Sequence, residues 1–169
     1  KGGRDGEART DPAVTWRDVQ TIFLLPFRRA IREAGALGVM SSYNDYDGIP
    51  ITASRLFLTQ ILREEWGFRG YVVSDSRAVE FIHAKHGVAT DNADGIRQAV
   101  EAGLNVRTDF TKPEDFVMPL RQLVRDGRLP ESVIDARVRD VLRVKFWQGW
   151  FDTPYRDPAP ADMVVRSPA

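Results

Sequence analysis

The chain has 169 residues, of which 43% are hydrophobic and 28% are charged, so it can bury a core and has an ordinary globular composition. Its 24 basic and 24 acidic side chains balance, which removes any net-charge argument for nucleic acid or an anionic membrane surface. The lack of cysteine excludes disulfides and thiol chemistry, and no apolar run approaches a membrane span. We therefore expect neither a nucleic acid nor a membrane as a partner.

The first 35 residues predict a loop followed by one long helix. Residues 1–12 are polar and rich in glycine, as is typical of a loop. Thr15, with Asp18 three residues later, resembles a capping box, and apolar side chains then recur at helical spacing until Gly35. Pro26 lies inside this pattern and predicts a kink in the helix.

Three short strands are predicted in the rest of the chain, at residues 38–43, 71–75 and 104–107, where β-branched and aromatic side chains gather. A polar turn is expected at 44–48. Helical spacing is found between and after the strands, at 54–66, 78–85 and 92–102 and in two helices opened by Pro113 and Pro130. This alternation favours parallel strands joined by right-handed crossovers. Three such strands would leave both sheet edges bare, so we expect an α/β segment of a larger barrel or sheet.

The composition changes near residue 152. Residues 1–152 carry the alternating pattern and are expected to form the partial domain. Residues 153–169 contain four prolines and predict a linker or tail toward a following domain. The chain also opens at Lys1 without methionine, and we expect that sequence is missing in front of it.

Asp75 is the first candidate for chemistry. It follows the predicted strand directly, and parallel α/β folds place catalytic groups at the carboxyl ends of strands. Asp is also a favoured N-cap residue. The local pattern alone therefore leaves open whether Asp75 reacts or only caps the next helix.

Five runs, ordered and correctly spaced, together resemble glycoside hydrolase family 3, and the resemblance extends over about residues 15–155. They are Val39-Met-Ser-Ser-Tyr-Asn, Asp47-Gly-Ile-Pro, Leu62-Arg-Glu-Glu-Trp-Gly-Phe-Arg-Gly-Tyr-Val-Val-Ser-Asp75, Ala102-Gly-Leu-Asn-Val, and Arg139-Asp-Val-Leu-Arg-Val-Lys-Phe with Gly149-Trp-Phe-Asp-Thr-Pro-Tyr155. The resemblance implies the second half of that family's N-terminal (β/α)8-like barrel, with the three predicted strands as strands six to eight.

The resemblance also implies that Asp75 is the nucleophile of a retaining, exo-acting β-glucosidase or β-xylosidase. Such an enzyme hydrolyses terminal β-linked sugars of β-glucosides, β-xylosides or oligosaccharides. The chemistry suits the residue, because a retaining mechanism needs an ionised carboxylate that attacks the anomeric carbon and forms a covalent glycosyl-enzyme.

Substrate-binding positions follow from the same resemblance. Met40 and Tyr43 match the family's Met-x-x-Tyr beside the sugar subsite, although Met40 could equally be a core residue. Ser76 stands where much of the family has a tryptophan wall of the sugar site, so a different pocket shape is expected. Arg4 and Arg9 follow the place of a Lys-His pair that binds sugar hydroxyls, and they either reach the site or remain solvated loop charges.

No general acid/base can be assigned in this chain. In the family that group comes from a following α/β sandwich domain or a distant loop, so we expect it outside this chain. The expected partners are a carbohydrate substrate, the first half of the barrel and the α/β sandwich domain. The isolated segment is expected to be inactive.

Two other functions remain open: a non-catalytic sugar-binding or half-barrel structural module, and the family's β-N-acetylglucosaminidase branch, whose His-containing loop is not found here. His83 and His86 have helical spacing, but Lys85 lies between them and a third ligand is missing, so we expect no metal and no cofactor. The arginines of the last helix, at 137–143, are expected to form a solvated face. The sequence does not fix the compartment; secretion or a periplasmic location is only a tendency of the family.

Overall fold

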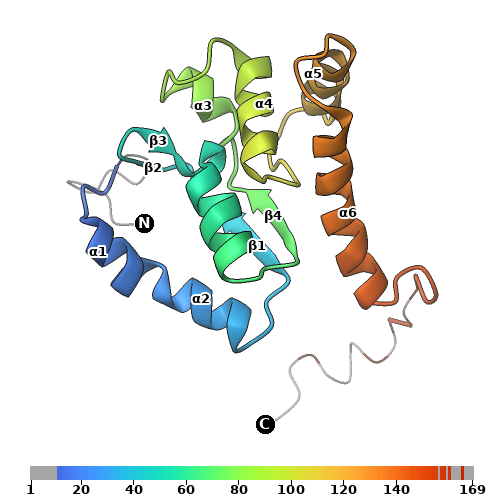
Figure 1. Ribbon diagram of the computed structural model, residues 1–169. Helices are drawn as coiled ribbons and strands as arrows, with labels where there is room; N and C mark the ends of the chain where they lie inside the picture. Colours follow the sequence, from blue (N-terminus) through green and yellow to red (C-terminus); the bar gives the residue numbers. More distant parts are fainter. Residues whose placement is uncertain (1–10, 156, 159, 161–164, 166–169) are drawn as a thin grey trace.

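The computed structural model describes residues 11–155, 157, 158, 160 and 165, and two parallel strands stand at its centre (Figure 1). These are β1 (Gly38–Ser41) and β4 (Tyr71–Ser74), which pair in register along their whole length. The third predicted strand is reduced to one parallel bridge between Val73 and Val106. The predicted α/β arrangement is confirmed, with strands shorter than expected.

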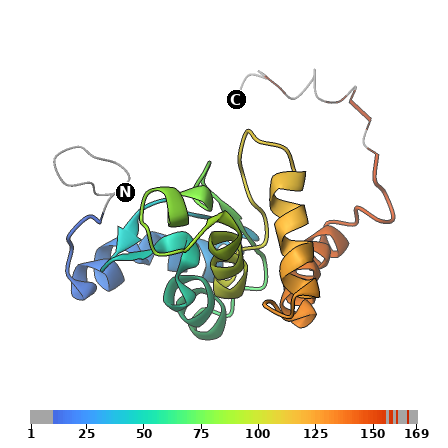
Figure 2. The same ribbon diagram turned by 90° about the horizontal axis from the view of Figure 1, so that it is seen from above.

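Helices connect and flank the strands. They are α1 (Trp16–Asp18), the π-helical η2 (Val19–Phe23), α2 (Leu25–Arg32), the 3₁₀ turn η3 (Ile51–Ala53), the π-helical η4 (Leu56–Glu65), α3 (Glu80–Ala84), α4 (Asn92–Ala102), α5 (Glu114–Arg125) and α6 (Glu131–Trp147). Helices α1 and α2 lie at one end of the molecule and α5 and α6 at the other, in both views (Figures 1 and 2). Over the part of the chain that the structure describes, no helix has the length and apolar character needed to cross a membrane.

Local capping signals set the helix boundaries where the sequence predicts them. The Thr15 hydroxyl accepts the N–H of Asp18 at the start of α1, and the Asp91 carboxylate accepts the N–H of Asp94 at the start of α4. Gly103 ends α4 at a φ of 128°, where a β-carbon would also crowd η4. The predicted helix at 92–102 is confirmed to the residue.

The core lies between β4 and the helices η4, α3 and α4. Its central side chains, among them Val72, Ile82, Ala99 and Leu104, are fully buried. Gly70 leads the chain into β4 against the Leu37 carbonyl, and a β-carbon there would lie only 2.1 Å from that oxygen. Close packing at this point therefore fixes β4 beside β1.

The helix predicted from Thr15 to Ala34 is divided. Pro26 occupies the first turn of α2, where its missing N–H needs no partner, so it begins a helix instead of kinking one. The helix predicted at 54–66 is η4, with π-type bonds such as Trp66 N–H to the Ile61 carbonyl. The buried side chains of η4, Leu58, Ile61 and Leu62, keep the i, i+3, i+4 spacing of an α-helix, so apolar spacing alone does not reveal the π-type bonds.

A short hairpin replaces the polar turn expected at 44–48. Strands β2 (Asp45–Tyr46) and β3 (Ile49–Pro50) pair antiparallel around Asp47 and Gly48, which both have positive φ. This is the geometry of a two-residue type I′ turn, for which Asp-Gly is a preferred sequence.

Candidate active site

Asp75 follows β4 directly, at the carboxyl end of the strand. Its N–H donates to the Ser41 carbonyl at 3.0 Å, which extends the ladder with β1 by one residue. Its Oδ1 accepts the Ser76 N–H at 2.8 Å, and its carbonyl accepts the Ala78 N–H at 3.0 Å. The side chain is half-buried. Helix α3 starts after Val79, which supplies its N-cap, so Asp75 is not the N-cap residue of that helix.

Both flanks of Asp75 are bound to Thr108. The Thr108 N–H donates to the hydroxyl of buried Ser74 at 2.9 Å, and the Arg77 N–H donates to the Thr108 carbonyl at 3.1 Å. Arg77 adopts a left-handed backbone with a φ of 61°, and its guanidinium lies 5.6 Å from the centre of the Phe81 ring. The turn that carries Asp75 is thus held on the segment after Val106.

Tyr43 lies in the loop after β1 and is held by residues that follow β4. Its ring meets Phe81 edge to face, with centroids 6.3 Å apart. Its carbonyl lies 3.0 Å from Nε2 of His86, and because a carbonyl only accepts, Nε2 carries the hydrogen. Nδ1 of His86 lies 3.8 Å from the Asp45 carboxylate, and the His86 side chain is only 8% exposed.

The other predicted site residues do not lie together. Ser76 is half-buried beside Asp75. Met40 is 52% exposed on β1 and lines an apolar cavity of about 330 Å³ between α2, β1 and η4, to which Asp75, Tyr43 and Ser76 do not contribute. Arg4 and Arg9 lie outside the described residues. The binding roles assigned to these side chains stay predictions.

Sequence reasoning missed a charged group near the carboxyl end of β4, the Arg107 cluster (Glu80, Arg107, Asp109 and Thr111), in which the Arg107 and Asp109 side chains are buried. Nε of Arg107 lies 2.6 Å from Oε1 of Glu80, and Nη2 lies 2.6 Å from Oδ2 of Asp109. Nη2 also donates to the Thr111 hydroxyl, and Nη1 to the Lys112 carbonyl at 3.4 Å. The one sequence signal was a charged residue directly after an apolar strand.

Asp109 is almost fully buried, with 3% of its side chain exposed. Burial alone would raise the pKa of this carboxyl. Hydrogen bonds from the Phe110 N–H, the Thr111 hydroxyl and Arg107 outweigh burial and bring the pKa of Asp109 below its ordinary value. Asp109 is therefore an ionised partner of Arg107 at neutral pH.

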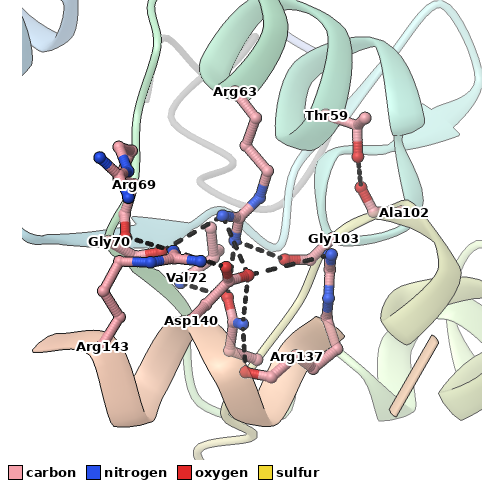
Figure 3. Close-up of polar contacts among 11 residues, drawn as sticks. Thr59, Arg63, Arg69, Gly70, Val72, Ala102, Gly103, Arg137, Asp140 and Arg143 are labelled. Carbon is pink, nitrogen blue, oxygen red and sulfur yellow. Dashed lines mark hydrogen bonds and ion pairs between the residues drawn. The ribbon is translucent and has the colours of Figure 1, made fainter. Parts of the chain in front are cut away.

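A second buried group, the Arg63 cluster (Arg63, Asn105, Arg137, Asp140 and Arg143), lies at the opposite end of β4. Figure 3 shows Arg63 extending from η4 toward Asp140 on α6, with Nη1 at 3.1 Å from Oδ2. Nη2 of Arg63 donates to Oδ1 of Asn105 at 2.8 Å, and that oxygen also accepts the Val72 N–H at 2.8 Å. The cluster thereby ties the start of β4 to α6.

The arginines of α6 are not the solvated face that was expected. Arg143 donates to Asp140 at 3.0 Å and to the Arg69 carbonyl at 2.9 Å (Figure 3), and Arg137 also lies within 4 Å of Asp140, whereas Arg139 is exposed. Burial lowers the pKa of Arg63 to about 10, against the attraction of Asp140. Burial also lowers the pKa of Arg137.

Among the described residues, no three His, Cys, Asp or Glu side chains are grouped so that they could hold a metal ion. The polar groups at the carboxyl end of β4 are instead carboxylates, hydroxyls and the guanidinium groups of Arg77 and Arg107. Such a set can offer a nucleophile and hydrogen bonds to a polyhydroxylated ligand.

Comparisons with known proteins find one family model and several relatives that match this chain. Residues 2–144 match the glycosyl hydrolase family 3 N-terminal domain. A putative β-xylosidase of Formosa agariphila is 38% identical over 142 residues, which cover 84% of this chain and 18% of that protein. The solved structure of a β-glucosidase from Erythrobacter marinus is 42% identical, with a TM-score of 0.79, over 85% of this chain and 19% of that one.

The β-glucosidase of Listeria innocua, solved in complex with glucose, is 29% identical with a TM-score of 0.82, over 91% of this chain and 21% of its own. The chain thus spans about a fifth of the length of the relatives it matches. The resemblance that its five sequence runs carry is confirmed by the match over residues 2–144 and by the likeness in fold. The chain belongs to glycosyl hydrolase family 3.

Proposed function

We propose that this chain supplies the nucleophile of a retaining, exo-acting β-glucosidase or β-xylosidase. The observation that carries the proposal is the position of Asp75, half-buried at the carboxyl end of β4 and fixed by its backbone bonds to Ser41 and Ala78. The relatives named as β-xylosidase and β-glucosidase support this substrate class.

In the proposed reaction, an oxygen of Asp75 attacks the anomeric carbon of a terminal β-linked sugar. The bond between that carbon and the glycosidic oxygen breaks, the leaving oxygen takes a proton from a general acid, and a glycosyl ester of Asp75 forms. Water then attacks the same carbon, gives a proton to the conjugate base of that acid, and releases the sugar and the free carboxylate.

Tyr43 is the proposed neighbour of the sugar. Its hydroxyl can donate a hydrogen bond to a carboxylate, and its ring offers a stacking face. The Phe81 ring and the bond from His86 to the Tyr43 carbonyl fix the loop that presents it. Ser76, beside Asp75, leaves room where much of the family has tryptophan.

The general acid is proposed to come from another part of the enzyme. Glu80 is paired with Arg107 at 2.6 Å, and Asp47 is exposed on the hairpin turn, so neither offers a proton beside Asp75. A following α/β sandwich domain, reached through residues 153–169 after a partial barrel of residues 1–152, is the proposed source.

Apolar surface on the described residues supports a first half of the barrel as partner. One such surface is the cavity beside β1, which Val39, Phe27 and Trp66 help to line. Another is a stripe of exposed side chains one turn apart on α6: Val138, Leu142 and Phe146. Exposed apolar patches of this kind mark contact surfaces.

The test uses the intact enzyme with an aryl β-glucoside and an aryl β-xyloside. Asp75→Asn should lower kcat by on the order of 10⁴-fold while substrate binding is kept. Asp75→Gly should regain turnover with azide and form the α-glycosyl azide, because azide would attack from the face that the carboxylate leaves empty. Asp47→Asn, which changes an exposed aspartate, is the matched control and should leave turnover unchanged.

Unchanged turnover in both Asp75 variants would overturn the proposal and favour a non-catalytic sugar-binding or structural module. An aryl N-acetyl-β-glucosaminide in the same substrate panel tests the remaining branch of the family. Preference for that substrate would replace the β-glucosidase or β-xylosidase assignment.

A further inference from the structure

We infer that Glu80 and Arg107 are positioning residues that hold Asp75 in place for attack on the sugar, an inference that rests on the proposed function. Neither side chain is assigned a contact with the substrate. They are proposed to act by holding together two chain segments, one that follows β4 and one that follows Val106.

The ion pair joins those two segments directly. Glu80 stands in the first turn of α3, five residues after Asp75, and Arg107 follows the bridge residue Val106. The pair is 2.6 Å long, and the Arg107 side chain is only 7% exposed. A charge-assisted bond of this length at a buried site fixes the relative position of the segments that carry its partners.

Arg107 also orders its own segment. Its Nη2 binds Asp109 and Thr111 and its Nη1 the Lys112 carbonyl, so the guanidinium fork is shared among four groups. A planar, rigid guanidinium can hold several acceptors at once in a way that a lysine ammonium cannot. The chain from residue 107 to residue 112 is therefore folded around the Arg107 side chain.

The link from this segment to Asp75 is short. Thr108, the residue after Arg107, donates to the Ser74 hydroxyl and accepts the Arg77 N–H. Ser74 precedes Asp75 and Arg77 follows it by two residues. A shift of the segment after Val106 thus moves both flanks of the nucleophile, and small displacements of a reacting group are costly for rate.

Glu80 suits a positioning role and not that of a proton donor. Its Oε1 is already engaged by Nε of Arg107 at 2.6 Å, in a pair that joins two chain segments. Loss of Arg107 would leave Glu80 and Asp109 buried without their common cation. Substitution of Glu80 is expected to disturb the fold less than substitution of Arg107, so the primary test is made at Glu80.

The test measures covalent labelling of Asp75 in the intact enzyme by a 2-deoxy-2-fluoro-β-glycoside with a dinitrophenolate leaving group. This leaving group needs no proton, so the first-order rate constant reports nucleophilic attack apart from acid catalysis, and the saturation constant reports binding. Glu80→Ala should lower the rate constant about tenfold with little change in the saturation constant. Glu80→Gln, which keeps an oxygen acceptor for Nε of Arg107, should restore most of the rate.

The matched control is Glu101→Ala, which removes a second glutamate–arginine pair of 2.6 Å, with Arg97 on α4. It should leave the labelling rate unchanged. A labelling rate in Glu80→Ala equal to that of the parent enzyme would overturn the inference, as would an equal loss in the control.

If Glu80→Ala does not fold, Arg107→Lys replaces it, because lysine keeps the charge and loses the fork. An unchanged labelling rate in Arg107→Lys overturns the inference as well. Peptide mapping of the labelled enzyme distinguishes failure of the proposed function from failure of the positioning roles. Label absent from Asp75 in the parent enzyme overturns the proposed function, whereas label on Asp75 with unchanged variant rates overturns only the positioning roles.

Discussion

Buried arginine ion pairs lie at both ends of β4, but the pairs at the two ends join different parts of the chain. At the amino end, Arg63 and Arg143 bind Asp140, so the strand is tied to helix α6. At the carboxyl end, Arg107 binds Glu80 and Asp109, so the segment after Val106 is tied to the first turn of α3. The first arrangement joins a strand to a long helix, and the second orders the segments that follow β4 and Val106.

The balance of charge also differs between the clusters. Three arginines share Asp140 at the amino end, and burial lowers the pKa of Arg63 to about 10. One arginine serves two carboxylates at the carboxyl end, where the pKa of Asp109 lies below its ordinary value. In barrels of parallel strands, chemistry belongs to the carboxyl ends and stability to the amino ends, so we expect changes in the Arg107 cluster to affect turnover and changes in the Arg63 cluster to affect stability.

The largest effect that separates the two ends is expected from Asp140→Ala. The change leaves Arg63 without its ion-pair partner, and removal of one member of a buried ion pair costs about 3–5 kcal/mol. Denaturant unfolding of the intact enzyme should show this loss, while turnover per folded molecule should be unchanged. Asp135→Ala, at an exposed position of the same helix, is the control; a parallel fall in turnover of folded Asp140→Ala would break the comparison.

Asn105→Ala should have a smaller effect at the same end. It leaves the Val72 N–H and Nη2 of Arg63 without their shared acceptor, and a buried unsatisfied group costs about 1–3 kcal/mol. Faster hydrogen exchange of the Val72 amide should accompany the loss of stability. The same change at exposed Asn92 should leave that exchange rate as it is, and slow exchange in Asn105→Ala would argue against the assigned role.

The carboxyl end should respond to acid. Because the folded pKa of Asp109 is below its ordinary value of about 4, the unfolded chain takes up this proton first as the pH falls. Asp109 therefore stabilises the fold above about pH 4, and this contribution is lost below that pH, through the folded pKa. Asp109→Asn should flatten the acid limb of a plot of unfolding free energy against pH. An unaltered limb would show that Asp109 does not contribute to the pH dependence of stability.

The smallest expected effect concerns His86 and the Tyr43 loop. His86→Leu removes the donor to the Tyr43 carbonyl and should raise KM for an aryl glycoside a few-fold with little change in kcat. His86→Gln retains an N–H donor and should restore KM. A KM in His86→Leu equal to that of the parent enzyme would show that the Tyr43 loop does not depend on this hydrogen bond.

Sequence reasoning predicted the parts of the fold that rest on local signals. The helix predicted at 92–102 is α4, which begins after the Asp91 cap and ends at Gly103. The apolar run before Asp75 is β4. The hairpin at residues 45–50 also had a local signal, Asp47-Gly48, which was interpreted only as a turn. The π-type bonding of η4 had no such signal, because its buried residues Leu58, Ile61 and Leu62 keep ordinary α-helical spacing.

The site was predictable only in part. Asp75 and Tyr43 belong to sequence runs that resemble a known family, whereas Arg107 and Glu80 are 27 residues apart and share no pattern. His86, which the sequence linked only to helical spacing with His83, is nearly buried and reaches the Tyr43 carbonyl 43 residues away. Buried charges are decided by which distant segments fold against each other, and spacing along one helix cannot reveal this.

The left-handed backbone of Arg77 limits how freely the turn after Asp75 can move. Glycine would adopt a φ of 61° at lower conformational cost, but it would also let the reversal after Asp75 sample many shapes. A side chain at this position limits that freedom before any ligand binds. The turn that follows Asp75, the proposed nucleophile, would therefore lose less conformational entropy on ligand binding than a glycine turn would.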